Sequence, residues 1–131
     1  MDSLQKDEII KLRLGQAYEA LSEAEILFRH GAYPGTFNRI YYAMFYAVQA
    51  LAVKFDFKTS KHGQLIGWFN KEFIKTGLME PRLFELLRTA FDRRSDADYQ
   101  VVRVEPVEEE VAQMLTDLRA FIVQIETFLR K

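Results

Sequence analysis

The residues best suited to chemistry lie together in one run, Asp92–Tyr99, which contains three aspartates, two arginines, a serine and a tyrosine. It is the densest cluster of charge in the chain. One hypothesis is a phosphate-binding site, because a guanidinium can donate two parallel hydrogen bonds to a phosphate. The alternative is a solvated helix end, at which the arginines meet the last free carbonyls and pair with the aspartates.

Four other polar or aromatic features have structural interpretations. Arg39 lies within an apolar segment, where an arginine normally needs a carboxylate or several hydrogen-bond acceptors, so a structural anchor is expected. His30 precedes Gly31 and is expected to cap a helix. Asp98 could orient Arg94 through a salt bridge or cap the following loop, and both roles are compatible. A group of aromatic residues suits the core and an interface equally well and is assigned to no site: Tyr41, Tyr42, Phe45 and Tyr46.

The first half of the chain predicts two helices. Apolar residues recur every three or four positions from Ile10 to Phe28, which is typical of an amphipathic helix, and Gly31 ends it. A turn is expected over residues 33–35. Residues 36–57 are apolar on nearly every side, so this segment is predicted to be the central helix of a bundle.

The second half predicts three more helices. One extends from about Ser60 to Gly77, one starts at Pro81, and one covers residues 107–128. Residues 95–105 are expected to form the loop before the last helix. Since the chain has no internal repeat or flexible linker, residues 1–131 are predicted to be a single all-α domain. Its expected architecture is an up-and-down bundle of about five helices, four in the bundle and one extra.

The composition excludes several classes of protein. The 18 basic and 19 acidic residues nearly cancel, so any contact with nucleic acid would have to be local. Without cysteine there is no disulfide, thiolate nucleophile or zinc–thiolate site. The first residues do not resemble a signal peptide, and the longest apolar stretch is too short to cross a bilayer, so a cytoplasmic protein without a membrane span is expected.

No familiar motif for catalysis, a metal or a cofactor occurs in the sequence. It has no phosphate-cradling glycine loop, no His-Glu-x-x-His pair, no nucleophile elbow and no paired glutamates of a di-iron bundle. Residues 108–110 are three glutamates, but consecutive helical residues point in different directions, so they are interpreted as surface charge that matches the helix dipole. No metal and no cofactor are expected.

Four segments of the sequence form a pattern in their order and spacing. They are Asn38-Arg39-Ile40-Tyr41-Tyr42-Ala43-Met44-Phe45-Tyr46-Ala47, Ser60-Lys61-His62-Gly63, Phe73-Ile74-Lys75-Thr76-Gly77-Leu78, and Ala90-Phe91 followed by the run Asp92–Tyr99. Together they resemble a prokaryotic subgroup of the HEPN family (higher eukaryotes and prokaryotes nucleotide-binding). The resemblance implies a five-helix bundle that forms a homodimer and is often encoded beside a minimal nucleotidyltransferase as a toxin–antitoxin pair. It also implies that active members cut RNA without a metal.

The catalytic motif of active members is an arginine, four to six variable residues and a histidine, with both protomers contributing to one cleft. Arg94 and Tyr99 have this spacing, with tyrosine in place of histidine. Arg94 is the expected phosphate clamp. A phenol with an ordinary pKa of about 10 can donate a proton or stack on a base, but can hardly accept a proton. His62 could supply the missing base if the fold brings it to Arg94, and is otherwise an exposed residue at the start of a helix.

Two functions follow from the resemblance. The first is a toxin-like protein that binds RNA or a nucleotide at a dimer cleft through Arg93, Arg94, Asp98 and Tyr99, with metal-independent cleavage of RNA as its activity. The second is a non-catalytic dimeric scaffold for a minimal nucleotidyltransferase. Tyrosine at position 99 favours binding over cleavage.

Overall fold

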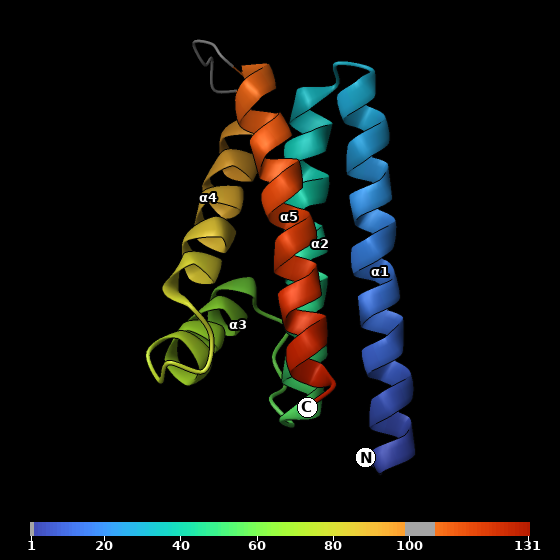
Figure 1. The fold of residues 1–131 in the computed structure, drawn as a ribbon, viewed down its shortest axis with the longest axis vertical. Helices are drawn as coiled ribbons and strands as arrows, with labels where there is room; N and C mark the ends of the chain where they lie inside the picture. The colour runs from blue at the N-terminus through green and yellow to red at the C-terminus, as the bar shows by residue number, and fades with distance from the viewer. Residues whose placement is uncertain (1, 99–106) are drawn as a thin grey trace.

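The computed structural model describes residues 2–98 and 107–131, and for residues 96–98 and 107 it describes the backbone alone. Every regular element in these residues is helical, which confirms the predicted all-α bundle (Figure 1). The elements are α1 (Ser3–Arg29), α2 (Tyr33–Lys54), α3 (His62–Phe69), the π-helical turn η1 (Asn70–Ile74), α4 (Pro81–Asp98) and α5 (Val107–Leu129). A single domain over residues 1–131 stays a prediction.

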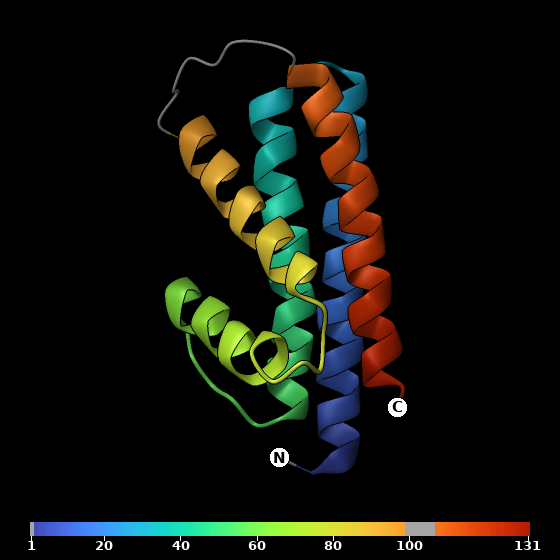
Figure 2. The ribbon, with the colours of Figure 1, turned by 60° about the vertical axis from the view of Figure 1, so that its left-hand side comes forward.

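Three long helices, α1, α2 and α5, lie side by side, and α4 leans against the opposite side of α2 (Figures 1 and 2). The short α3 crosses the lower end of the bundle at a steep angle (Figure 2). Helix α2 contacts α1, α3, α4 and α5, so the prediction that this segment is the centre of the bundle is confirmed. More than half of its residues are buried because neighbours surround it.

The helix ends mostly follow the local signals of the sequence. Gly31 and Gly77 both have positive φ, at 70° and 80°, a conformation that glycine adopts without steric cost. Pro81 begins α4 as predicted. The prediction of a turn over residues 33–35 was wrong, because α2 already begins at Tyr33. Pro34 lies in the first turn of this helix, where its missing N–H and fixed φ are compatible with helical structure.

Helix α4 is longer than predicted. Residues 95–98 were assigned to the loop, but they continue α4 to Asp98. Serine and aspartate have only a modest preference against helix, and the packing of α4 against α2 outweighs it. As a result Arg94 lies one turn before the last residue of α4 and not at the end of the helix, where it was predicted.

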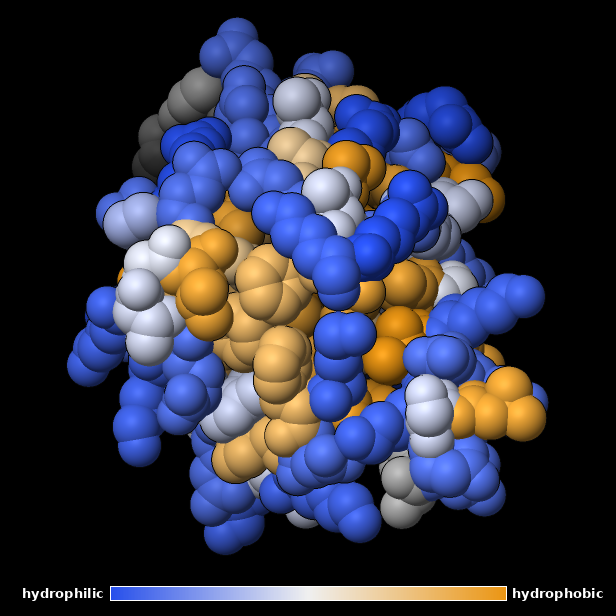
Figure 3. Space-filling view, turned by 60° about the horizontal axis from the view of Figure 1, so that its bottom comes forward, coloured by the Kyte–Doolittle hydropathy of each residue, from blue (hydrophilic) through white to orange (hydrophobic). Residues whose placement is uncertain are grey.

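Aromatic side chains close the lower end of the bundle. Phe73 packs against Phe55, Trp68 and Phe128, with ring centroids 5.4, 5.2 and 5.4 Å apart. This cluster joins η1 and α3 to the ends of α2 and α5. Figure 3, in which this end is turned toward the viewer, shows hydrophobic side chains gathered between charged ones, and Phe55 is 49% exposed.

None of the helices in the part of the chain that the structure describes is long and apolar enough to span a membrane.

Candidate functional site

Arg94 on α4 packs against two consecutive tyrosines of α2. Its guanidinium carbon Cζ lies 5.2 Å from the ring centroid of Tyr41 and 5.5 Å from that of Tyr42. At these distances the electron-rich ring faces attract a cation. Arg94 and Tyr42 are half-buried, whereas Tyr41 is fully buried. The two rings therefore hold the guanidinium in one place at the surface of the bundle.

His62, the first residue of α3, contacts the same two tyrosines. Its Nδ1 lies 2.9 Å from the hydroxyl of Tyr41, and its ring centroid lies 5.8 Å from the centroids of both Tyr41 and Tyr42. The imidazole also stacks on Phe45, with centroids 4.0 Å apart and planes 30° apart. Helix α2 thus brings together two side chains, His62 and Arg94, that are 32 positions apart in the sequence.

The environment sets the protonation of this cluster. Burial, and then the positive charge of Arg94, lower the pKa of His62 below its usual value, so the imidazole is neutral at neutral pH. Burial raises the pKa of Tyr41 to about 12, although the charge of Arg94 acts in the opposite direction. Tyr41 therefore keeps its proton, and its hydroxyl can either donate to Nδ1 or accept from it.

The tautomer of His62 decides what its other nitrogen can do. When Nδ1 carries the proton and donates to the oxygen of Tyr41, Nε2 has a free lone pair and can act as a base. When the Tyr41 hydroxyl donates to Nδ1, Nε2 carries the proton and acts as a hydrogen-bond donor. Both tautomers are compatible with the distance between the two side chains.

Arg93, adjacent to Arg94, has a different environment. It is only 4% exposed, and it forms a bidentate pair with Glu110 in the first turn of α5: Nε lies 2.5 Å from Oε2, and Nη2 donates to Oε1 over 2.9 Å. Its Cζ also lies 4.4 Å from the ring centroid of Phe37 on α2. Arg93 therefore joins α4 to α5 and α2. Glu110, interpreted from the sequence as surface charge, is half-buried and holds this arginine.

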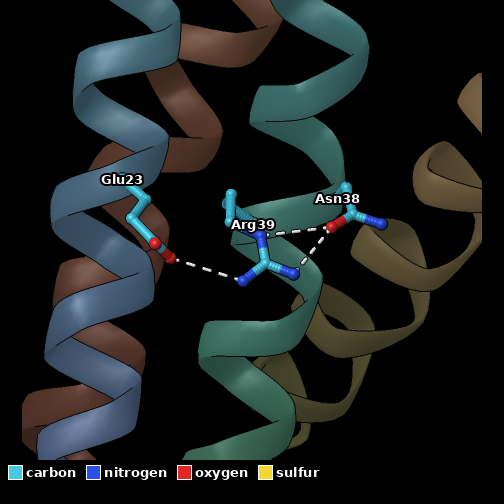
Figure 4. A network of polar contacts seen from close by, with 3 residues as sticks. All are labelled: Glu23, Asn38 and Arg39. Carbon is cyan, nitrogen blue, oxygen red and sulfur yellow. Dashed lines mark hydrogen bonds and ion pairs between the residues drawn. The ribbon is translucent and has the colours of Figure 1, made fainter.

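Arg39, three residues before Tyr42 on α2, lies beside the same ring. Its Nε and Nη2 donate to Oδ1 of Asn38 over 3.2 and 2.9 Å, and its Nη1 donates to Oε1 of Glu23 on α1 over 3.3 Å (Figure 4). Its Cζ is 5.2 Å from the ring centroid of Tyr42. Glu23 supplies the carboxylate expected beside an arginine in this helix.

The remaining candidate residues cannot be placed by their side chains. Asp98 is the last residue of α4, where the backbone alone is described, and Tyr99 lies outside the described residues. By contrast, three aromatic residues that the sequence assigned to no site belong to this cluster. Tyr41 and Tyr42 contact both His62 and Arg94, and Phe45 contacts His62. No signal in a single sequence separates such residues from core residues, because aromatic side chains at helical spacing are found in both.

The cluster combines a fixed cation, a half-buried tyrosine ring and a neutral imidazole. A cation can bind a phosphate, a ring can stack on a base, and an imidazole can exchange a proton near neutral pH. Among the described residues, no three histidine, aspartate or glutamate side chains come together as ligands for a metal. The features define an all-α bundle with an arginine- and aromatic-rich site between α2, α3 and α4.

Comparison with known proteins identifies the family. The model of the HEPN domain matches residues 10–127, and the chain belongs to the HEPN domain family. A UPF0332 protein of Thermotoga maritima is 34% identical over 125 residues, which cover 95% of this chain and 94% of the relative. Two proteins of Methanocaldococcus jannaschii are also similar. The one named "Putative toxin MJ0142" is 33% identical over 98% of this chain and 86% of its own length, and "Putative toxin MJ0605" is 30% identical over 98% and 96%.

Proposed function

We propose that this chain is a toxin-like HEPN protein that binds RNA at the face formed by Arg94, Tyr42 and His62, and that it cleaves RNA without a metal. The observation that carries the proposal is the convergence of Arg94 and His62 on the same pair of tyrosines. Family membership and the toxin names of two relatives support it.

In the proposed reaction Arg94 binds the scissile phosphate through its guanidinium and offsets the charge that builds up on it. The neutral Nε2 of His62 takes the proton of the ribose 2′-hydroxyl, and the 2′-oxygen attacks phosphorus. The bond from phosphorus to the 5′-oxygen breaks, and that oxygen receives a proton from Tyr99 or water. The products are a 2′,3′-cyclic phosphate and a 5′-hydroxyl end. Tyr99 enters this scheme through its sequence spacing from Arg94.

The assembly is also part of the proposal. The protein acts as a homodimer in which both protomers line one cleft, with Asp98 and Tyr99 contributing beside Arg94, and a minimal nucleotidyltransferase is its partner in a toxin–antitoxin pair in the cytoplasm. Arg93 is less suited to contact RNA directly than Arg94, since Glu110 and the bundle already enclose it. Its contribution is to position α4.

A second function, a non-catalytic scaffold for the nucleotidyltransferase, is favoured by one observation. Tyr99 occupies the position that is histidine in the catalytic motif, and a phenol is a poor base at neutral pH. In that case the Arg94 face would bind a nucleotide or the partner protein without cleaving RNA.

The test is cleavage of a mixed single-stranded RNA by the purified chain, free of its partner, in the presence of a chelator. We expect Arg94→Gln and His62→Gln to abolish cleavage, and Tyr99→Phe to reduce it if the phenol donates the final proton. His30→Gln, at the other histidine, and Arg82→Gln, an exposed arginine of α4 paired with Asp117, are matched controls that should retain activity. Absence of cleavage by the unmodified protein, with RNA binding retained, would replace the nuclease by the scaffold function.

A further inference from the structure

Two arginines from different helices converge on the ring of Tyr42. The Cζ atoms of Arg39 on α2 and Arg94 on α4 lie 5.2 and 5.5 Å from its centroid, so these two carbons are no more than about 11 Å apart. Among the described residues, Tyr42 is also beside the neutral His62. Proteins bind single-stranded nucleic acid in grooves where cations contact the phosphates beside aromatic side chains.

Arg39 is held in position while retaining the capacity to bind a ligand. A guanidinium has five N–H donors, and the bonds to Asn38 and Glu23 use three of them. Both bonds to Asn38 go to one oxygen of an immediately adjacent side chain, so they fix the plane of the guanidinium without neutralising its charge.

The only carboxylate paired with Arg39 in the described part of the chain, that of Glu23, is a weak competitor for a phosphate. The bond is 3.3 Å long, and the side chains of Arg39 and Glu23 are 28% and 48% exposed. Exposed pairs of this kind contribute little and are screened by salt. A phosphate can therefore share or replace the contact with Glu23, while Asn38 continues to orient the arginine.

We infer that Arg39 and Arg94 form a two-arginine subsite for single-stranded RNA, in which each guanidinium contacts a phosphate of the same strand and the ring of Tyr42 holds both cations in place. This inference rests on the proposed function and extends it from one arginine to two. It changes the interpretation of Arg39 from a structural anchor alone to a residue that contacts the substrate. Because the two carbons are at most about 11 Å apart, phosphates of one short stretch of a single strand can contact both arginines.

The experiment measures binding of the full chain to a fluorescently labelled single-stranded RNA of about 12 nucleotides, a length within the usual site sizes. Its riboses are 2′-O-methylated, so that it cannot be cleaved through the 2′-hydroxyl. The slope of the logarithm of the binding constant against the logarithm of salt concentration decreases by about 0.7–1 for each phosphate that the protein no longer neutralises. We expect this decrease in Arg39→Gln and in Arg94→Gln, with binding roughly tenfold weaker at low salt. Arg39→Lys, which keeps the charge, should keep the slope, and Arg82→Gln is the control.

Glu23→Gln distinguishes a phosphate contact from a structural role. If Arg39 binds phosphate, removal of the competing carboxylate should tighten RNA binding by about twofold to fivefold, because such a surface pair is worth under about 1 kcal/mol. If Arg39 is only an anchor between α1 and α2, this variant should lower the thermal midpoint and leave the affinity unchanged. Circular dichroism establishes that each variant is folded.

The two proposals fail in different ways. If Arg94→Gln weakens binding and reduces the slope while Arg39→Gln does neither, the two-arginine subsite is wrong and the proposed function stands. If the unmodified protein does not bind RNA at all, the proposed function is wrong and the subsite with it.

Discussion

The pair between Arg93 and Glu110 allows a sharp test of how α4 is positioned. Glu110→Ala removes a bidentate carboxylate from a guanidinium that is only 4% exposed. Removal of one partner of a buried pair costs about 3–5 kcal/mol, because nothing then offsets the desolvation of the remaining charge. Glu110 itself is 33% exposed, so solvent can compensate part of the loss. We therefore expect the free energy of unfolding to decrease by about 2–4 kcal/mol.

The assay is equilibrium unfolding in urea, followed by circular dichroism. Glu109→Ala is the matched control, since it also removes a glutamate carboxylate from the first turn of α5, but at an exposed position. It should cost under about 1 kcal/mol, through the lost interaction with the helix dipole. The double substitution Arg93→Met with Glu110→Leu should recover most of the loss, because apolar residues of similar size often replace a buried pair without cost.

Two results would contradict this prediction. Glu110→Ala and Glu109→Ala could lower the free energy of unfolding equally, or the double variant could be as unstable as Glu110→Ala. The first result would show that the pair contributes nothing beyond the helix dipole, and the second that Arg93 is held by its contact with Phe37 and by packing.

Three further predictions concern the site and the core. Because the pKa of His62 is lowered in the folded protein, the unfolded state binds more protons between that pKa and the ordinary value of about 6.5. Stability should therefore decrease as the pH falls below about 6.5, and urea midpoints of His62→Gln should lack that part of the decrease; equal pH profiles would refute this. Cleavage of RNA should lose rate as the pH falls through the lowered pKa of His62 in the folded protein, and a rate that increases on acidification would contradict the role of His62 as a base. Phe73→Ala should lower the free energy of unfolding by about 3–5 kcal/mol, since Phe73 is buried in the aromatic cluster. Phe55→Ala, at the exposed side of that cluster, should cost clearly less. Comparable losses in thermal or urea unfolding would show that the cluster is not organised around Phe73.

The bundle itself could be predicted from the sequence. The apolar period of α1, the apolar surface all around α2, the glycines at positions 31 and 77, and Pro81 are local signals, and the helices begin and end close to them. The errors were also local. Residues 95–98 were assigned to a loop from their weak helix preference, and residues 33–35 to a turn from a proline and a glycine, whereas packing and the first-turn position of Pro34 make both segments helical.

The site was predictable only in part. The sequence singled out Arg94 and His62, but did not show that they meet, because their proximity depends on the way α3 and α4 pack against α2. Nor did it show that Arg93 and Arg94 have different environments. Consecutive residues of a helix point about 100° apart, so one arginine is enclosed between α4, α2 and α5 while its neighbour reaches the tyrosine rings.

The sequence by itself therefore determined the helical class and the family, and it singled out Arg94 as a candidate. These depend on residue types and on spacing along one helix, which short-range sterics and hydrogen bonding control. The tertiary structure alone decided that Glu110 holds Arg93, that His62 is a neutral imidazole beside Arg94, and that Tyr42 contacts two arginines. Each of these features depends on contacts between separate helices. Such contacts are selected by the packing of side chains, which has no signature in the local sequence.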